Sequence, residues 1–86
     1  MRNEYLVWFN GTPDPFLDPY EWCRDEFGNL LKRSDYGNRQ SPYGWEIDHR
    51  VPKALGGSDL FTNLLPLHHH ASSTMGGILG GILSRV

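Results

Sequence analysis

The chain has 86 residues, which is enough for one domain with a small core, so we treat residues 1–86 as a single unit. Hydrophobic residues make up 38% and aromatic residues 13%, which excludes an intrinsically disordered composition. The formal net charge of −2 lacks the basic excess usual in nucleic-acid-binding domains, and no apolar stretch is long enough to span a bilayer.

The first predicted element is a short strand. The apolar run from Tyr5 to Phe9 indicates this strand, and Asn10-Gly11 indicates a turn after it. The same run is shorter than the hydrophobic region of a signal peptide. We therefore expect a cytoplasmic protein with no membrane partner.

A helix is predicted after the proline-rich loop of residues 12–19. Asp18 suits the N-cap, a proline follows at the first helical position, and Glu21 stands three residues after the cap, as in a capping box. The helix would run from about Pro19 to Phe27, and Gly28 would end it.

Three side chains, those of Trp22, Cys23 and Trp45, are predicted to lie in the core. Cys23 is the single cysteine, so an internal disulfide is excluded, and a reducing compartment or a lone core thiol accounts for it. Trp22 and Trp45 are expected in the core rather than on a base-stacking surface.

The centre of the chain predicts two more strands. One is short, at Leu30–Lys32, and a turn-rich segment follows at residues 36–44. From Trp45 to His49 the residues alternate in character, so this run predicts a strand with Ile47 and His49 on one face.

The strand at residues 45–49 is predicted to pair with a returning strand. Residues 56–59, Gly-Gly-Ser-Asp, form a flexible loop, and Asn63–Pro66 can return as the second strand. A helix is expected from about Leu67 onward. The order is strand, loop, strand, helix.

Three polar residues of this segment suit phosphodiester hydrolysis. Asp48 offers a hard anionic oxygen for a divalent ion such as Mg²⁺. The adjacent His49 can take a proton from water near neutral pH, and the amide of Asn63 can hold the imidazole or its loop. An Asp-His pair alone is weak evidence, because most such pairs are structural or exposed.

The wider pattern is more specific. The run IDHRVPKALGGSDLFTNLLPLH, with CRDEFGNLLKRSDYGNRQSPYGWEIDH partly overlapping it upstream, resembles a small single-domain branch of the HNH endonuclease family. The resemblance covers about Trp22 to Gly77. It implies an α+β chain with a ββα-metal motif at about residues 44–76. Proteins with this motif are usually encoded by bacteria or phages.

The resemblance also implies roles for individual residues. His49 matches the general base, Asp48 the first metal ligand and Asn63 the residue that orients the base through the connecting loop. The cofactor would be one divalent ion, Mg²⁺ or Mn²⁺, with Ni²⁺ or Zn²⁺ as alternatives, and the partner would be DNA.

The sequence departs from the family at the third metal ligand. The family has His or Asn nine residues after the middle Asn, and here that position is Ser72, a poor ligand. His69 lies three residues earlier on the same helical face and is a candidate substitute ligand. His68 is expected instead to pack or cap at the helix start, and His70 should point away.

Phosphate contacts are expected from cations beside the motif. Arg50 and Lys53 flank the predicted catalytic strand, and Arg39 lies in the turn-rich segment before it. The basic residues that the family carries on its helix are missing here.

Two other functions remain open from the sequence. One is a catalytically impaired module of the same fold that binds nucleic acid or a protein partner, favoured by Ser72 and by the acidic balance. The other is an assembly protein, with the Gly/Ile/Leu-rich tail at residues 77–86 as a self-association segment and a homodimer as one outcome. The leading prediction is a metal-dependent DNA endonuclease.

Overall fold

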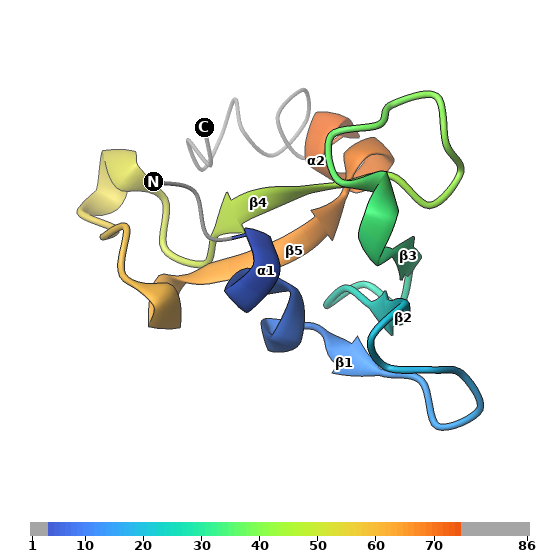
Figure 1. The fold of residues 1–86 in the computed structure, drawn as a ribbon. Coiled ribbons are helices and arrows are strands. Elements are labelled where there is room, and N and C mark those ends of the chain that lie inside the picture. The colour runs from blue at the N-terminus through green and yellow to red at the C-terminus, as the bar shows by residue number, and fades with distance from the viewer. Residues whose placement is uncertain (1–3, 75–86) are drawn as a thin grey trace.

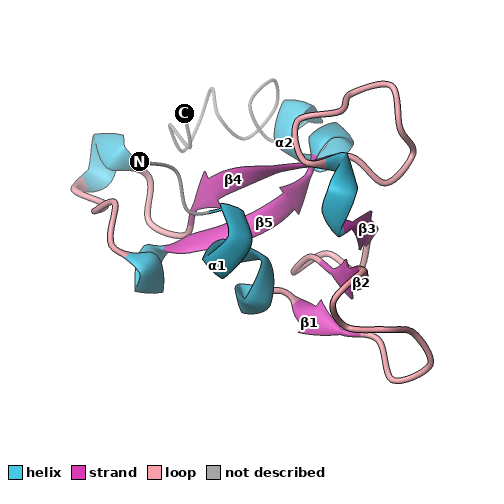
Figure 2. Cartoon of the chain, in the orientation of Figure 1, coloured by secondary structure: helices cyan, strands magenta, loops and turns pink. Residues whose placement is uncertain are grey.

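The chain forms a mixed α+β structure with two antiparallel sheets (Figure 1). A computed structural model of the protein describes residues 4–74. One sheet has the strand order β1–β2–β3, and the other is the hairpin β4–β5, which lies in the middle of the view with helical segments around it (Figure 2). The strands are β1 (Thr12–Pro13), β2 (Trp22–Arg24), β3 (Leu30–Lys32), β4 (Trp45–His49) and β5 (Leu64–His68). The helices are α1 (Glu4–Val7) and α2 (His69–Thr74), with the 3₁₀ turns η1 (Trp8–Asn10), η2 (Arg33–Asp35), η3 (Lys53–Leu55) and η4 (Phe61–Asn63).

The predicted strand at Tyr5–Phe9 is wrong, because this segment is helical in α1 and η1. Val7 and Trp8 are adjacent and both fully buried, whereas Leu6 and Phe9 on either side are exposed. A strand would bury alternate residues, but a helical turn can direct two successive side chains into the core. The segment Tyr5–Phe9 therefore contacts the core through one side of a helical turn.

The predicted helix at Pro19–Phe27 is also wrong. Asp18 does cap a turn, since its Oδ1 accepts the N–H of Tyr20 and its backbone oxygen accepts the N–H of Trp22. The turn ends there, and β2 then pairs on one side with β1 and on the other with β3. Gly28, predicted as the helix end, has a φ of 85° and lies in the β2–β3 turn.

Asp25 explains why this segment turns instead of continuing as a helix. Its carboxylate is buried, and Oδ1 accepts the N–H groups of Phe27 and Asn29, which closes the β2–β3 turn. Oδ2 accepts the N–H of His68 at 3.0 Å, at the end of β5. A buried charge is tolerated when hydrogen bonds replace its water, so Asp25 joins the two sheets.

The predictions for the centre of the chain are largely confirmed. The strands at Leu30–Lys32 and Trp45–His49 have the predicted bounds. The returning strand covers Leu64–His68, one residue later at its start and two later at its end than predicted, and α2 follows it at His69–Thr74. In the antiparallel register Trp45 pairs with His68 and His49 with Leu64.

The core lies between the two sheets and η1. Its buried cluster contains Trp8, Cys23, Leu31 and Trp45, so the core positions predicted for Cys23 and Trp45 are confirmed. Burial, and secondarily the charge of Asp25, raises the pKa of the Cys23 thiol to about 12. The thiol is therefore neutral, and no disulfide forms from it within the chain.

Trp22 is only partly buried, so its predicted core position is correct in part. It packs edge-on against Tyr43, with ring centroids 5.1 Å apart, and the ammonium of Lys32 lies 5.6 Å from its ring. This aromatic pair covers the outer side of the β1–β2–β3 sheet rather than filling the core.

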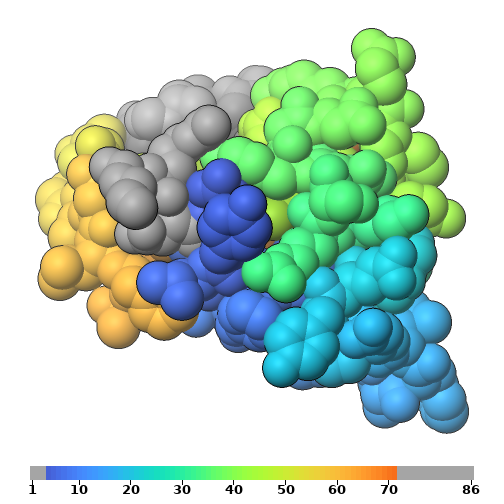
Figure 3. Space-filling model, viewed as in Figure 1, coloured from blue at the N-terminus to red at the C-terminus, as the bar shows by residue number. Residues whose placement is uncertain are grey.

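The segment after β1 projects from the body of the molecule (Figure 3), and Phe16 within it is almost fully exposed. Within residues 4–74, no helix has the length and apolar character needed to cross a membrane. The tail at residues 77–86, for which self-association was considered, lies outside the described residues.

Candidate functional site

The β4–β5 hairpin presents Asp48 and His49 at one end. Asp48 pairs with Leu65 and His49 with Leu64, the last pairs of the ladder before the connecting loop. Successive strand residues face opposite sides, so Asp48 shares a face with Glu46. A Cβ placed on Gly44, just before β4, would lie 3.1 Å from Cδ2 of His69, so the start of α2 lies beside the other end of β4.

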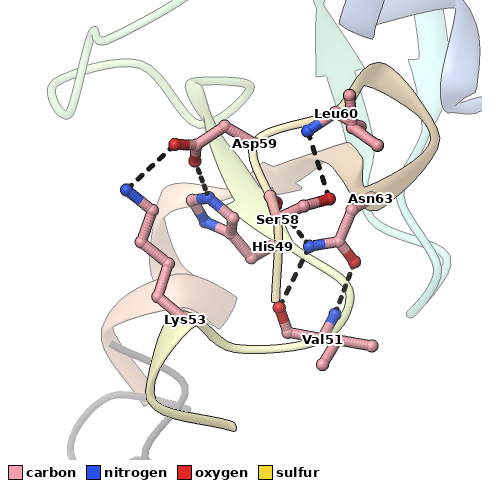
Figure 4. A network of polar contacts seen from close by, with 7 residues as sticks. All are labelled: His49, Val51, Lys53, Ser58, Asp59, Leu60 and Asn63. Atoms are coloured by element: carbon pink, nitrogen blue, oxygen red, sulfur yellow. Dashed lines mark hydrogen bonds and ion pairs between the residues drawn. The ribbon is translucent and has the colours of Figure 1, made fainter. Parts of the chain in front are cut away.

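The loop from β4 to β5 is held by the side chain of Asn63 (Figure 4). Its Oδ1 accepts the N–H of Val51 at 2.8 Å, and its Nδ2 donates to the carbonyls of Val51 at 3.1 Å and Ser58 at 2.7 Å. Asn63 is buried, so these bonds replace those that water would make. Of the two arrangements expected for this amide, the structure shows the one in which it holds the loop.

The two loop glycines are needed for different physical reasons. Gly56 has a φ of 87°, in the left-handed region that side chains disfavour. A Cβ at Gly57 would lie 1.7 Å from the carbonyl oxygen of Val51, where no atom fits. The loop therefore turns at Gly56, and at Gly57 its backbone passes close to the backbone of Val51 at the start of the same loop.

Asp59, in this loop, contacts His49. Its Oδ1 lies 2.6 Å from Nε2 of His49, and its Oδ2 lies 3.1 Å from Nζ of Lys53. These hydrogen bonds, first that from His49 and then that from Lys53, lower the pKa of the Asp59 carboxyl below its usual value. Sequence reasoning placed Asp59 only in a flexible turn; its position in the Gly-Gly-Ser-Asp run, ten residues after His49, was the available signal.

His68 caps helix α2, as predicted. Its Nδ1 accepts the N–H of His70 at 3.0 Å, which satisfies a donor that the first turn of the helix leaves open. Its Nε2 lies 2.7 Å from the carbonyl oxygen of Pro42, so the ring also fastens the turn before β4.

His69 lies at the opposite end of the hairpin from His49. Its backbone N–H donates to Gly44, and its Nε2 lies 2.9 Å from the carbonyl oxygen of Ser41. Four residues of extended strand separate Gly44 from Asp48, about 13 Å. The ring is thus held at the 41–44 turn, and its predicted role as a substitute ligand gains no support from this position.

The other predicted site residues have mixed surroundings. Ser72 lies in α2, but its side chain is not among those described. Arg39 forms an ion pair with Glu46 at 2.6 Å, and Lys53 pairs with Asp59. Arg50 is exposed directly after β4. Of the three cations predicted to contact phosphate, two therefore also hold carboxylates of the hairpin and its loop.

Asp48 is the residue of the site whose side chain is of the type that holds a hard divalent ion. Among the described residues no three His, Cys, Asp or Glu side chains are grouped as a metal site. Mg²⁺, however, is commonly held by one or two carboxylates and otherwise by water and phosphate oxygens. Asp48 carries a carboxylate of this type, whereas Zn²⁺ prefers several nitrogen or sulfur ligands.

No protein family, curated protein or solved structure matches the chain.

Replacing Asn63 with alanine is expected to lower the free energy of unfolding by about 2–3 kcal/mol, because one N–H and two carbonyl groups lose a partly buried partner. Urea denaturation measures this loss. Asn38→Ala is the matched control, since Asn38 makes an exposed local bond to Gln40 and its loss should cost about 1 kcal/mol or less. Equal losses in the two variants would contradict the assigned role of Asn63.

Proposed function

We propose that the chain is a metal-dependent DNA endonuclease of the HNH type, with a ββα-metal arrangement formed by β4, β5 and α2. One observation carries the proposal: the hairpin ends in Asp48 and His49, and Asn63 holds the loop that follows them. Helix α2 follows β5 directly, which is the strand, strand, helix order of this arrangement. The motif resemblance, which includes these same three residues and the Gly-Gly-Ser-Asp loop between them, favours the same function.

Each residue of the site has a chemical task in this proposal. His49 accepts the proton of a water molecule, whose oxygen then forms a bond to phosphorus while the bond to the leaving oxygen breaks. Asp48 would hold one divalent ion, Mg²⁺ or Mn²⁺, and this ion would stabilise negative charge on the phosphate and the leaving oxygen. Asn63 keeps the loop beside His49 in one conformation.

DNA is the proposed substrate, although the chain as a whole is acidic. Arg50 is exposed next to the catalytic strand and is the best placed of the predicted cations to contact a phosphate. The pairing of Arg39 with Glu46 and of Lys53 with Asp59 reduces the positive charge that these two residues present. Binding is therefore expected to be weak and to fall with added salt.

The proposal is tested by incubating the protein with supercoiled plasmid and Mg²⁺, Mn²⁺, Ni²⁺ or Zn²⁺. We expect nicked product with at least Mg²⁺ or Mn²⁺, none with EDTA, and at least about 100-fold slower cleavage by Asp48→Asn, which removes the anionic ligand. Ser72→Asn restores a carboxamide at the third ligand position and is expected to increase the rate. Agarose gels measure each rate.

Two outcomes would count against this function. Absence of cleavage with all four ions, by both the wild type and Ser72→Asn, would rule out the enzyme. DNA binding without cleavage would then favour the impaired module, which the serine at position 72 and the net charge of −2 already suggest.

A further inference from the structure

We infer that Asp59 is a positioning residue for His49, and that it makes Nδ1 the ring nitrogen that accepts the proton. This inference rests on the proposed function, because it names how the general base of that same site is oriented. It begins from the 2.6 Å contact between Nε2 of His49 and Oδ1 of Asp59 (Figure 4).

Asp59 is held in place although its side chain is two-thirds exposed (66%). The N–H of Gly57 donates to the carbonyl of Pro52, and Asn63 binds the carbonyl of Ser58, the residue before Asp59. Lys53 holds the second carboxylate oxygen from the other side. Two hydrogen bonds to loop carbonyls and one ion pair therefore hold the Asp59 carboxylate next to His49.

The contact determines which nitrogen of His49 carries the proton. A neutral imidazole has one N–H donor and one lone pair, and an ionised carboxylate only accepts hydrogen bonds. The lowered pKa of Asp59 keeps it ionised near neutral pH. Nε2 must then be the donor, and the lone pair that can take a proton from water is on Nδ1.

The same carboxylate also responds to the reaction. When a proton moves from water to Nδ1, the ring becomes an imidazolium, and its positive charge lies next to Oδ1 of Asp59. Carboxylates that orient a catalytic histidine and stabilise its charged form act in this way. Lys53 attracts the other carboxylate oxygen, which limits this stabilisation and keeps Asp59 turned toward the ring.

A purely structural role for Asp59 makes a different prediction. Asn in its place can still accept the Nε2 hydrogen bond and hold the loop, but it has no charge. If Asp59 only fastens the loop, Asp59→Asn should cleave DNA at the wild-type rate. If Asp59 positions and stabilises the base, kcat should fall on the order of 10-fold in Asp59→Asn and 100-fold in Asp59→Ala, with KM nearly unchanged.

The deciding experiment is NMR of the imidazole nitrogens in the free protein, which requires no activity. Long-range ¹H–¹⁵N spectra at a pH about two units above the ordinary pKa of histidine report the tautomer, and His49→Gln identifies the His49 signals. We expect His49 to be fully in the Nε2–H form, and Asp59→Ala to shift it toward the tautomer mixture of free imidazole. Ser58→Ala is the matched loop control and should leave the tautomer unchanged.

The outcomes separate this inference from the proposed function. An Nδ1–H tautomer in the wild type, or a tautomer unaffected by Asp59→Ala, would overturn the role of Asp59 whether or not the protein cleaves DNA. The inference also fails if the spectra agree with it and the wild type cleaves DNA, but Asp59→Asn retains the full kcat. Asp59 would then have a structural role only. Absence of cleavage by both the wild type and Ser72→Asn refutes the function, and the spectra still decide the orientation of His49.

Discussion

Replacing His49 with alanine is expected to lower the rate of metal-dependent plasmid cleavage about 1000-fold, within the range that removal of a general base produces. The imidazole is about three-quarters buried at the end of β4, where Asp59 orients it, and no other described imidazole lies at this end of the hairpin. The other three histidines lie at the far end of β5 or in α2. None of them can take over the proton.

The variant should remain folded, which makes its activity informative. The His49 side chain hydrogen-bonds to the exposed carboxylate of Asp59, and such exposed contacts contribute little to stability. Its backbone pairing with Leu64 does not depend on the side chain. Circular dichroism and the urea midpoint of unfolding should therefore stay close to those of the wild type.

His70→Ala is the matched control for His49→Ala. His70 is exposed, and its ring lies in a stack with His69, with centroids 5.3 Å apart. The His70→Ala variant should cleave plasmid at the wild-type rate. Equal cleavage by His49→Ala and the wild type would show that another group, or a contaminating nuclease, is responsible. Partial recovery of His49→Ala by added imidazole would support proton transfer specifically.

Replacing Trp45 with alanine is expected to have the largest effect on stability, a loss of about 3–5 kcal/mol. Trp45 is fully buried between Trp8 and Tyr36, whose ring centroids lie 5.2 Å and 4.8 Å from its own. Its indole N–H also donates to the carbonyl of Arg33. The substitution leaves a cavity in the core and leaves that carbonyl without its partner.

A loss of this size is a large part of the stability of a small domain, roughly 5–15 kcal/mol. Because Trp45 begins the strand that carries Asp48 and His49, unfolding here should remove the site as well. Urea denaturation followed by circular dichroism measures the effect. Trp22→Ala, at a partly buried tryptophan in β2, is the control and should lose clearly less. Equal midpoints for both variants would contradict the core described here.

Local patterns predicted strand β4, the loop after it and the contact of Asn63 with that loop. The alternation from Trp45 to His49 matches a strand of those bounds, and the Gly-Gly-Ser-Asp run is the loop after it. Asn63 was expected to hold the imidazole or its loop, and it holds the loop. These features are local, because a strand, a turn and a nearby amide need few contacts from elsewhere in the chain.

Short segments in the N-terminal half were decided by tertiary contacts instead. The run Tyr5–Phe9 has apolar residues for a strand, yet it forms a helical turn because Val7 and Trp8 fill the core together. Residues after Asp18 start with a capped turn, but three-residue strands form there because β1 and β3 provide pairing on both sides. Segments this short have too few internal hydrogen bonds to determine their own conformation.

The sequence by itself therefore determined the composition of the site: an Asp-His pair at a strand end, an Asn after the loop and a serine where the resemblance expects a ligand. The tertiary structure alone decided how these groups are oriented. It placed Asp59 beside His49 and Lys53 beside Asp59, and it held His69 at the other end of the hairpin. Side-chain contacts across a loop depend on the path of the backbone, and no spacing rule in the sequence specifies that path.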